Sequence, residues 1–195
     1  DTSGAKAFMG KLYYNPIEPL YLSASYYNSG NLKTSSSEMS IAGIVAPPAG
    51  TTKWDRTVWE VDARYDIGKG KKPLEPIAYS DSKAILRLSY GQFSDDITGA
   101  AERSGQFGFV EGTYNLTKRF YTAARYSLVD LDDGQTASLN GITSNKYQRY
   151  SLGLGYRWSE NTIVKAGYDW NRESKVSSTI DKHNDLFSAV VVSQF

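Results

Sequence analysis

Apolar side chains recur at every second residue in short segments along this chain, and a polar stretch separates each segment from the next. This spacing is typical of β-strands with one apolar face, because an amphipathic helix repeats at about 3.6 residues. Nine such segments occur, at 8–14, 20–26, 59–67, 84–90, 110–114, 120–128, 150–158, 164–170 and 187–195. The sequence therefore predicts an all-β fold, an antiparallel up-and-down sheet of nine strands.

The second face of these segments is polar, charged or small, so it should face water rather than a packed core. Its charged residues are Lys11, Glu60, Asp62, Arg64, Arg87, Glu111, Arg125, Arg149, Arg157, Lys165 and Asp169. Basic side chains outnumber acidic ones in this set, and the two signs are mixed along the chain. We expect these residues to line the wet lumen of a barrel, where they either set a field across the pore or pair across strands to stiffen its wall.

Aromatic residues gather at the ends of the apolar segments, with aliphatic or small residues between them. Those that predict a girdle are Tyr14, Tyr26, Tyr65, Tyr90, Tyr114, Tyr126, Tyr156, Trp158, Tyr168 and Trp170. Tyr and Trp favour the boundary between hydrocarbon and lipid headgroups, so two belts of this kind indicate a transmembrane β-barrel. A soluble barrel rich in tyrosine is the alternative.

The hydropathy of the chain is compatible with such a barrel. No stretch reaches the roughly 18 apolar residues that a transmembrane helix needs, and the nearest candidate, 41–50, is interrupted by Pro47 and Pro48. A spanning strand needs only about 10 residues, of which every second one faces lipid. A mean hydropathy of -0.47 therefore does not exclude a membrane protein.

The predicted connections alternate in length, as expected when one end of a barrel carries turns and the other carries loops. Short connections are expected at 15–19, 115–118 and 159–161, and long ones at 28–53, 94–106, 130–145 and 172–184. The connection at 68–82 is an exception, because it is long but falls on the short-turn side. The longest loop, 28–53, is the natural candidate for a segment that narrows the pore.

The last segment, Leu186 to Phe195, is an apolar alternating strand that ends in phenylalanine. It resembles the C-terminal signature of bacterial outer-membrane proteins, and 115–127 and 150–162 resemble the last strands of large porins. The resemblance implies a Gram-negative outer-membrane location, a lipid and lipopolysaccharide environment, and recognition of Phe187, Ala189, Val191 and Phe195 by the barrel-assembly machinery. The resemblance is also compatible with a homo-oligomer.

An odd strand number is unusual for a complete barrel of this type, which has an even number. We therefore expect residues 1–195 to form a single domain that is the C-terminal portion of a larger barrel of about 16 or more strands, completed by the parent protein or by another chain. The alternative is a tenth strand at 37–46, which would complete a small closed barrel.

Residues for catalysis or cofactor binding are scarce. The only histidine, His183, lies between Asp181 and Asp185 in a predicted loop, and it is expected to be solvated rather than to activate water. Acidic residues that could bind a cation, Asp95 with Asp96 and Asp130 with Asp132 and Asp133, are expected to be solvated too. The sequence thus predicts no enzyme, no metal and no cofactor.

With 22 basic and 21 acidic residues interspersed along the chain, a nucleic-acid partner is not expected. The function that the sequence favours is a channel for passive diffusion of small hydrophilic solutes or ions. The alternative is a structural barrel that sheathes or anchors a partner protein. The two differ in whether the lumen is open.

Overall fold

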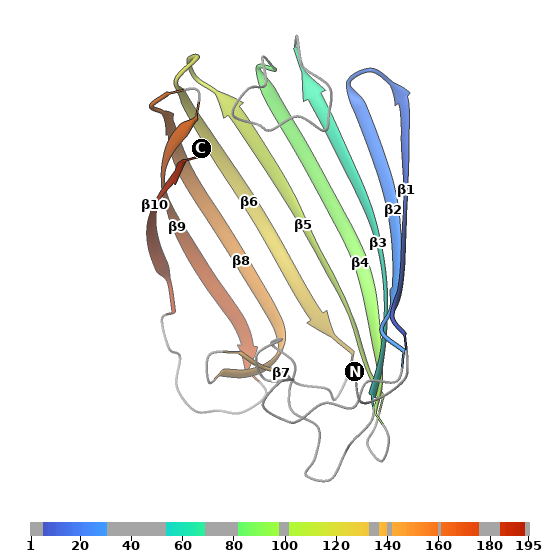
Figure 1. Ribbon diagram of the computed structural model, residues 1–195. Coiled ribbons are helices and arrows are strands. Elements are labelled where there is room, and N and C mark those ends of the chain that lie inside the picture. Colours follow the sequence, from blue (N-terminus) through green and yellow to red (C-terminus); the bar gives the residue numbers. More distant parts are fainter. Residues whose placement is uncertain are drawn as a thin grey trace.

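The computed structural model describes residues 6–30, 54–68, 82–97, 102–132, 137–139, 142–159, 161–175 and 184–193. These residues form one antiparallel sheet (Figure 1). Its strands are β1 (Phe8–Ile17), β2 (Leu20–Asn28), β3 (Trp54–Ile67), β4 (Ala84–Ile97), β5 (Arg103–Asn115), β6 (Phe120–Leu131), β7 (Ala137–Leu139), β8 (Ile142–Arg157), β9 (Thr162–Lys175) and β10 (Leu186–Ser193). Among the described residues, no helix is long and apolar enough to cross a membrane.

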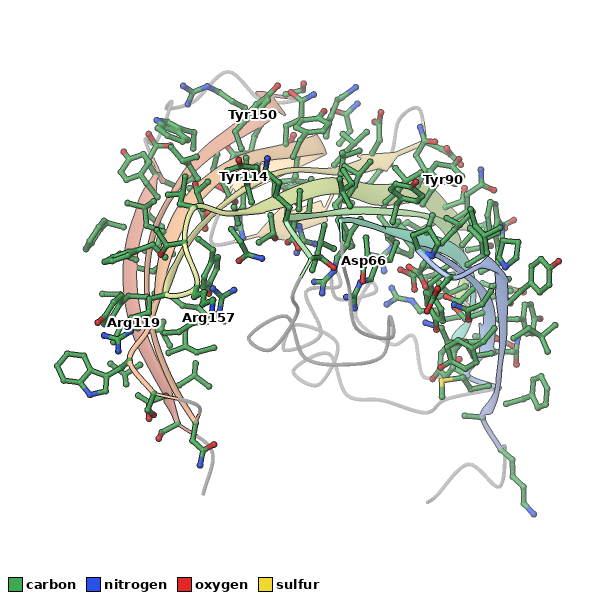
Figure 2. The ribbon with its side chains drawn as sticks, turned by 90° about the horizontal axis from the view of Figure 1, so that it is seen from above. Asp66, Tyr90, Tyr114, Arg119, Tyr150 and Arg157 are labelled. Atoms are coloured by element: carbon green, nitrogen blue, oxygen red, sulfur yellow. The ribbon has the colours of Figure 1, made fainter. Side chains whose placement is uncertain are left out.

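Nine of the strands follow one another across the sheet in chain order, from β1 to β6 and then β8 to β10, and the short β7 pairs only with β8. The predicted up-and-down sheet of nine strands is therefore confirmed. Seen from above, the sheet bends into an arc with β1 at one end and β10 at the other (Figure 2). No pairing joins β1 to β10 in the described part of the chain, and the tenth strand considered at 37–46 lies outside it.

Burial in this sheet is the reverse of that in a soluble protein. Among the described residues, Ile85 and Leu131 are the only apolar side chains that are buried, whereas Arg64, Asp66, Asp95 and Arg103 are buried and charged. Large apolar side chains are exposed; the exposed fraction is 62 % for Leu154 and 67 % for Val191. A soluble barrel would bury these side chains in its core, so the exposed apolar face needs an apolar partner.

The strands extend further toward the long loops than the alternation predicted. β4 continues to Ile97 and β5 begins at Arg103, so the loop predicted at 94–106 is mostly strand, with Ser94 paired to Ser104. Parts of 130–145 and 172–184 are likewise strand. The prediction was wrong there because both faces of these strand ends are polar, so apolar alternation stops although the backbone pairing continues.

The short connections lie together at one end of the sheet, at the top of Figure 1. The turn between β1 and β2 is tighter than the predicted 15–19, since β1 extends to Ile17 after an irregularity in pairing between Tyr14 and Ile17. Pro16 accounts for this irregularity, because it has no N–H to donate to the ladder.

Candidate pore lining

Each residue of the sheet can be assigned to one of its two faces. Asp66 and Arg157 point into the arc, whereas Tyr90 and Tyr150 point away from it (Figure 2). Side chains alternate along a strand, and direct cross-strand partners share a face. The pairing register therefore places all eleven charged residues predicted to line a lumen on the concave face. Their role in a pore stays a prediction.

A row of these residues crosses the middle of the concave face. Arg64, Arg87, Glu111, Arg125, Ser151 and Asp169 are successive cross-strand partners from β3 to β9. Glu111 lies between two arginines: its Oε1 is 3.2 Å from Arg87 Nη1 and its Oε2 is 3.8 Å from Arg125 Nη1. One carboxylate therefore neutralises part of the charge of two guanidinium groups.

The first three strands carry a second cluster, centred on Asp62. Lys11 Nζ donates to Asp62 Oδ2 at 3.1 Å, and the Ser23 hydroxyl donates to the same oxygen at 2.8 Å. Glu60 accepts a hydrogen bond of 2.5 Å from the Ser89 hydroxyl. Glu60 and Asp62 thus both have partners.

The two predicted lining arginines on β8, Arg149 and Arg157, have different partners from each other. Arg149 Nη1 lies 4.0 Å from Asp169 Oδ2, and Arg149 Nε donates to Asn171 Oδ1 at 2.8 Å. Arg157 instead binds the turn between β5 and β6, donating to Asn115 Oδ1 at 2.7 Å and to the carbonyl oxygen of Lys118 at 3.1 Å. Arg157 therefore binds the turn between β5 and β6, although it lies on the concave face as predicted.

Charge is unevenly divided over the concave face. Of the predicted lining residues, β1 and β3 carry Lys11 and Arg64 together with Glu60 and Asp62, which balance. Strands β4 to β9 carry the rest, a basic majority: Arg87, Arg125, Arg149, Arg157 and Lys165 against Glu111 and Asp169. Lys165 is exposed and, among the described residues, no ion pair is found for it. The β4 to β9 side of the lumen is consequently the more positive.

The convex face carries the aromatic residues predicted as girdles, and the register places all ten on it or in line with it. Several form ring contacts with other aromatic residues on neighbouring strands. Trp59 lies 5.5 Å from Tyr90 and Tyr150 lies 4.9 Å from Tyr126, measured between ring centroids. Near the turns, Phe120 lies 4.7 Å from Tyr156. Trp59 and Tyr150 are the first residues of their predicted segments, and the strands that contain them begin earlier, at Trp54 and Ile142.

Aromatic rings also lie on the concave face, and sequence reasoning missed them. They include Phe107, Phe109 and Tyr121. Arg125 lies over the Phe109 ring, with Cζ 3.8 Å from the ring centroid, and Arg157 lies over Tyr121 at 4.7 Å. An arginine stacked on a ring keeps its planar donor edge available while losing freedom to move. The signal was available, since each ring lies an even number of residues from Glu111 or Arg125 on its own strand.

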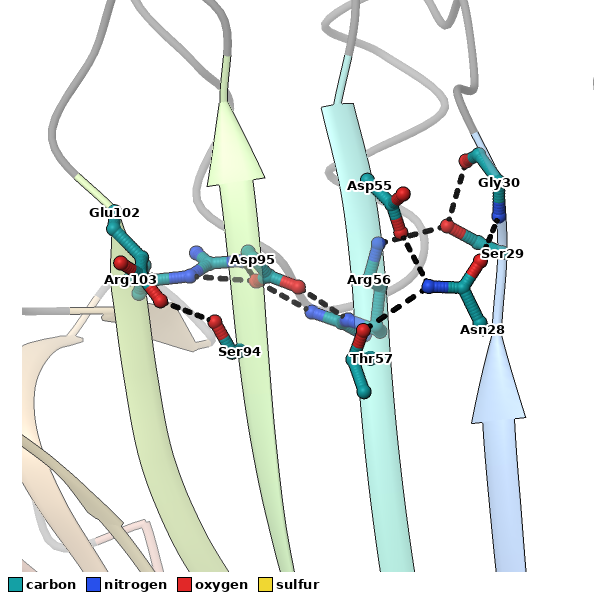
Figure 3. Close-up of polar contacts among 10 residues, drawn as sticks. All are labelled: Asn28, Ser29, Gly30, Asp55, Arg56, Thr57, Ser94, Asp95, Glu102 and Arg103. Atoms are coloured by element: carbon teal, nitrogen blue, oxygen red, sulfur yellow. Dashed lines mark hydrogen bonds and ion pairs between the residues drawn. The ribbon is translucent and has the colours of Figure 1, made fainter.

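Near the long loops, a buried network joins β3, β4 and β5 (Figure 3). Asp95, with an exposed fraction of 0 %, accepts hydrogen bonds from Arg56 Nε at 2.6 Å and from Arg103 Nε at 3.0 Å. On the other face of the same strand ends, Asn28 donates to Asp55 and to Thr57. The prediction that Asp95 is solvated was wrong, because strands on both sides supply an arginine to it.

Two of the other loop acids are also engaged, whereas Asp96 is exposed as predicted. Asp130 forms an ion pair of 3.2 Å with Lys146, and Asp132 accepts a hydrogen bond from Ser104. No group of three or more metal-ligating side chains is found in the described part of the chain. Asp133, His183 and Phe195 lie outside the described residues. Phe187, Ala189 and Val191 face the convex side, where each pairs with an outward residue of β9.

This arrangement can form one wall of an aqueous passage. A concave face of paired charges holds water and polar solutes, and the paired side chains are held in place by their neighbours on adjacent strands. A convex face of aliphatic residues between aromatic belts suits hydrocarbon.

Comparisons with known proteins agree with this geometry. A family model described as Gram-negative porin matches residues 1–175. The fold resembles OmpT, an in-vitro folded outer-membrane protein of Vibrio cholerae, with a TM-score of 0.59 and 17 % identity over 96 % of this chain and 56 % of that chain. For a trimer form of OmpT, the TM-score is 0.55 and the identity is 19 %, over 95 % of this chain and 52 % of that chain. The chain thus spans about half the length of these proteins. No curated protein matches the sequence.

Proposed function

This chain belongs to the Gram-negative porin family and lies in the bacterial outer membrane, and on that premise we propose that it forms part of the wall of a channel for passive diffusion of small hydrophilic solutes and ions. The proposal assigns no catalytic step to the chain. Solutes would pass along the concave face, driven only by their own concentration gradient. The paired charges of that face replace some of the water that a polar solute loses in a narrow passage.

The observation that carries this proposal is the separation of charge between the two faces. On the described strands, the convex face has no charged residue between the aromatic belts; its charged residues, Asp55, Asp96, Asp130, Lys146 and Arg172, all lie near the long loops. The concave face is charged along its whole length. A structural barrel without a water-filled lumen would have no need for so many exposed charges inside.

The basic excess on β4 to β9 predicts a channel that prefers anions, and charge reversal at Arg149 should reduce this preference. The Arg149 side chain is 48 % exposed, so it can act on passing ions. In water, one unit of charge changes the energy of an ion 10 Å away by about 0.4 kcal/mol, or about twofold in local concentration. Arg149→Glu changes two units. We expect the ratio of anion to cation permeability to fall by more than about twofold, as measured from the reversal potential in a gradient of dilute KCl.

The matched control is Lys146→Glu, which makes the same charge change on the convex face of the same strand. Its reversal potential should stay close to that of the wild type. A wild-type protein that carries no current across planar bilayers would contradict the channel function. A conducting protein whose Arg149→Glu variant keeps its selectivity would contradict only the role of the concave arginines.

The proposal also includes the partners that the sequence suggests. Lipopolysaccharide would contact the aromatic belt near the long loops, and the barrel-assembly machinery would recognise the last strand. Phe187, Ala189 and Val191 lie on one face of β10 and are exposed, so they are accessible to such a factor. Lipid would cover the same side chains after insertion.

A further inference from the structure

Two aromatic side chains on the concave face lie over glycines of the neighbouring strand. Tyr121 on β6 and Gly155 on β8 are direct cross-strand partners, and so are Phe107 on β5 and Gly91 on β4. A Cβ added to Gly155 would overlap the Tyr121 ring, and one added to Gly91 would lie 2.5 Å from Phe107 Cζ. Glycine is therefore required at both positions for the rings to rest where they do.

At Gly155, glycine is required because the Tyr121 side chain occupies the place that a Cβ would take. The three atoms nearest to a Cβ there belong to the Tyr121 side chain, whereas at Gly91 a Cβ would also lie 2.6 Å from the carbonyl oxygen of Trp59. A ring folded over a cross-strand glycine covers backbone that has no side chain of its own. Any other residue at 155 would have to push the ring away from the sheet. Gly155 is thus the cleaner of the two positions to test.

The ring of Tyr121 also has a neighbour along the strand. Arg157, two residues beyond Gly155 on the same face, has its guanidinium 4.7 Å from the ring centroid and is held by Asn115 and Lys118. Arg157 therefore contacts the ring and is itself anchored to the turn between β5 and β6. A ring lifted from Gly155 has the interior of the arc as its free direction.

We propose that Gly155 sets the width of the passage at this level, because it lets the Tyr121 ring lie flat on the wall instead of projecting into the lumen. This inference rests on the proposed channel function. Gly155 and Tyr121 then act as a pair that limits the size of the hydrophilic solutes that pass. Gly91 and Phe107 form a second pair of the same kind nearer to the long loops.

The test is a double-mutant cycle of Gly155→Ala and Tyr121→Ala, measured as single-channel conductance in planar bilayers. Gly155→Ala should lower the conductance because it lifts the ring, and Tyr121→Ala should raise it because it removes the ring. In the Tyr121→Ala background, Gly155→Ala should have almost no effect, since no ring is left to move. Gly112→Ala is the control, because a Cβ there meets nothing within 4 Å.

The cycle can overturn the proposal in two ways: Gly155→Ala leaves the conductance unchanged, or it lowers the conductance equally with and without the ring. If Gly155→Ala alone does not fold, the double variant must still fold and conduct like Tyr121→Ala. The urea concentration at the midpoint of unfolding provides a readout without current, and Gly155→Ala should lower it only when Tyr121 is present. A wild type that carries no current would instead overturn the channel function, and with it the role of Gly155 in setting the width.

Discussion

Leu154→Arg is expected to lower the free energy of unfolding in lipid by about 2–4 kcal/mol, the cost measured for arginine near the midplane of an outer-membrane barrel. Leu154 points outward from β8 and is highly exposed. It lies between Tyr150, which belongs to the aromatic belt near the loops, and Tyr156, which belongs to the belt near the turns. An arginine at this position must reach an interface or draw water into the hydrocarbon. Urea titration of the protein refolded into lipid vesicles measures the difference.

Ser151→Arg is the matched control, because Ser151 lies on the same strand but on the concave face. Its cross-strand partners are Arg125 and Asp169, so a new arginine there can bind a carboxylate in water. We expect a much smaller change in the free energy of unfolding than for Leu154→Arg. Equal costs for the two substitutions would mean that the faces of β8, or the membrane itself, have been assigned wrongly.

The second large effect is expected for Asp95→Ala, which should lower the free energy of unfolding by about 3–5 kcal/mol. Asp95 is fully buried and is the shared partner of Arg56 and Arg103. Its removal leaves two guanidinium groups close together without the carboxylate that both contact. The loss of one partner in a buried ion pair is costly because the remaining charge cannot be fully solvated.

Asp96→Ala provides the comparison for Asp95→Ala in the same urea titration. Asp96 is the next residue of β4, faces the other side of the sheet and is exposed. An exposed substitution of this kind usually changes stability by no more than about 0.5 kcal/mol. If Asp95→Ala cost as little as Asp96→Ala, the network in Figure 3 would contribute nothing to the stability of the strand ends.

The order of the strands was predictable from sequence because alternation and connection length are local features. Each segment with period-two spacing became a strand, and consecutive strands became neighbours. The ends of the strands were not predictable in the same way. Ser94, Asp95 and Asp96 are all polar, so nothing in their order distinguishes a strand end from a loop. Their pairing with β5 depends on residues such as Arg103 and Ser104, which the alternation also placed in the loop.

The face on which each charged residue lies was also predictable, since it follows from parity along a strand. The partners of each charge were not. Glu111 binds Arg87 and Arg125 because the register places the three side by side, and that register depends on turn geometry. Likewise, Arg56 and Asp95 are 39 residues apart in the chain. A slip of one residue in any strand would have moved these side chains to the other face.

The inward rings show a further limit of the sequence pattern. Phe107 and Phe109 were not assigned to a face from the sequence, because they lie between the predicted loop at 94–106 and the predicted segment that begins at Val110. Parity with Glu111 places both rings on the concave face, and the register adds their neighbours there, Gly91 for Phe107 and Arg125 for Phe109. Cross-strand glycine and stacked arginine provide the space and the partner that an apolar ring needs on a polar wall.

A cysteine scan of β8 from Arg149 to Leu154 tests most directly whether this sheet separates lipid from a water-filled lumen. The chain contains no cysteine, so each introduced thiol is unique. In the reconstituted protein, a water-soluble thiol reagent should label positions 149, 151 and 153 rapidly and positions 150, 152 and 154 slowly. Labelling that does not alternate, or concave positions that do not react at all, would contradict a membrane-spanning wall with an open lumen.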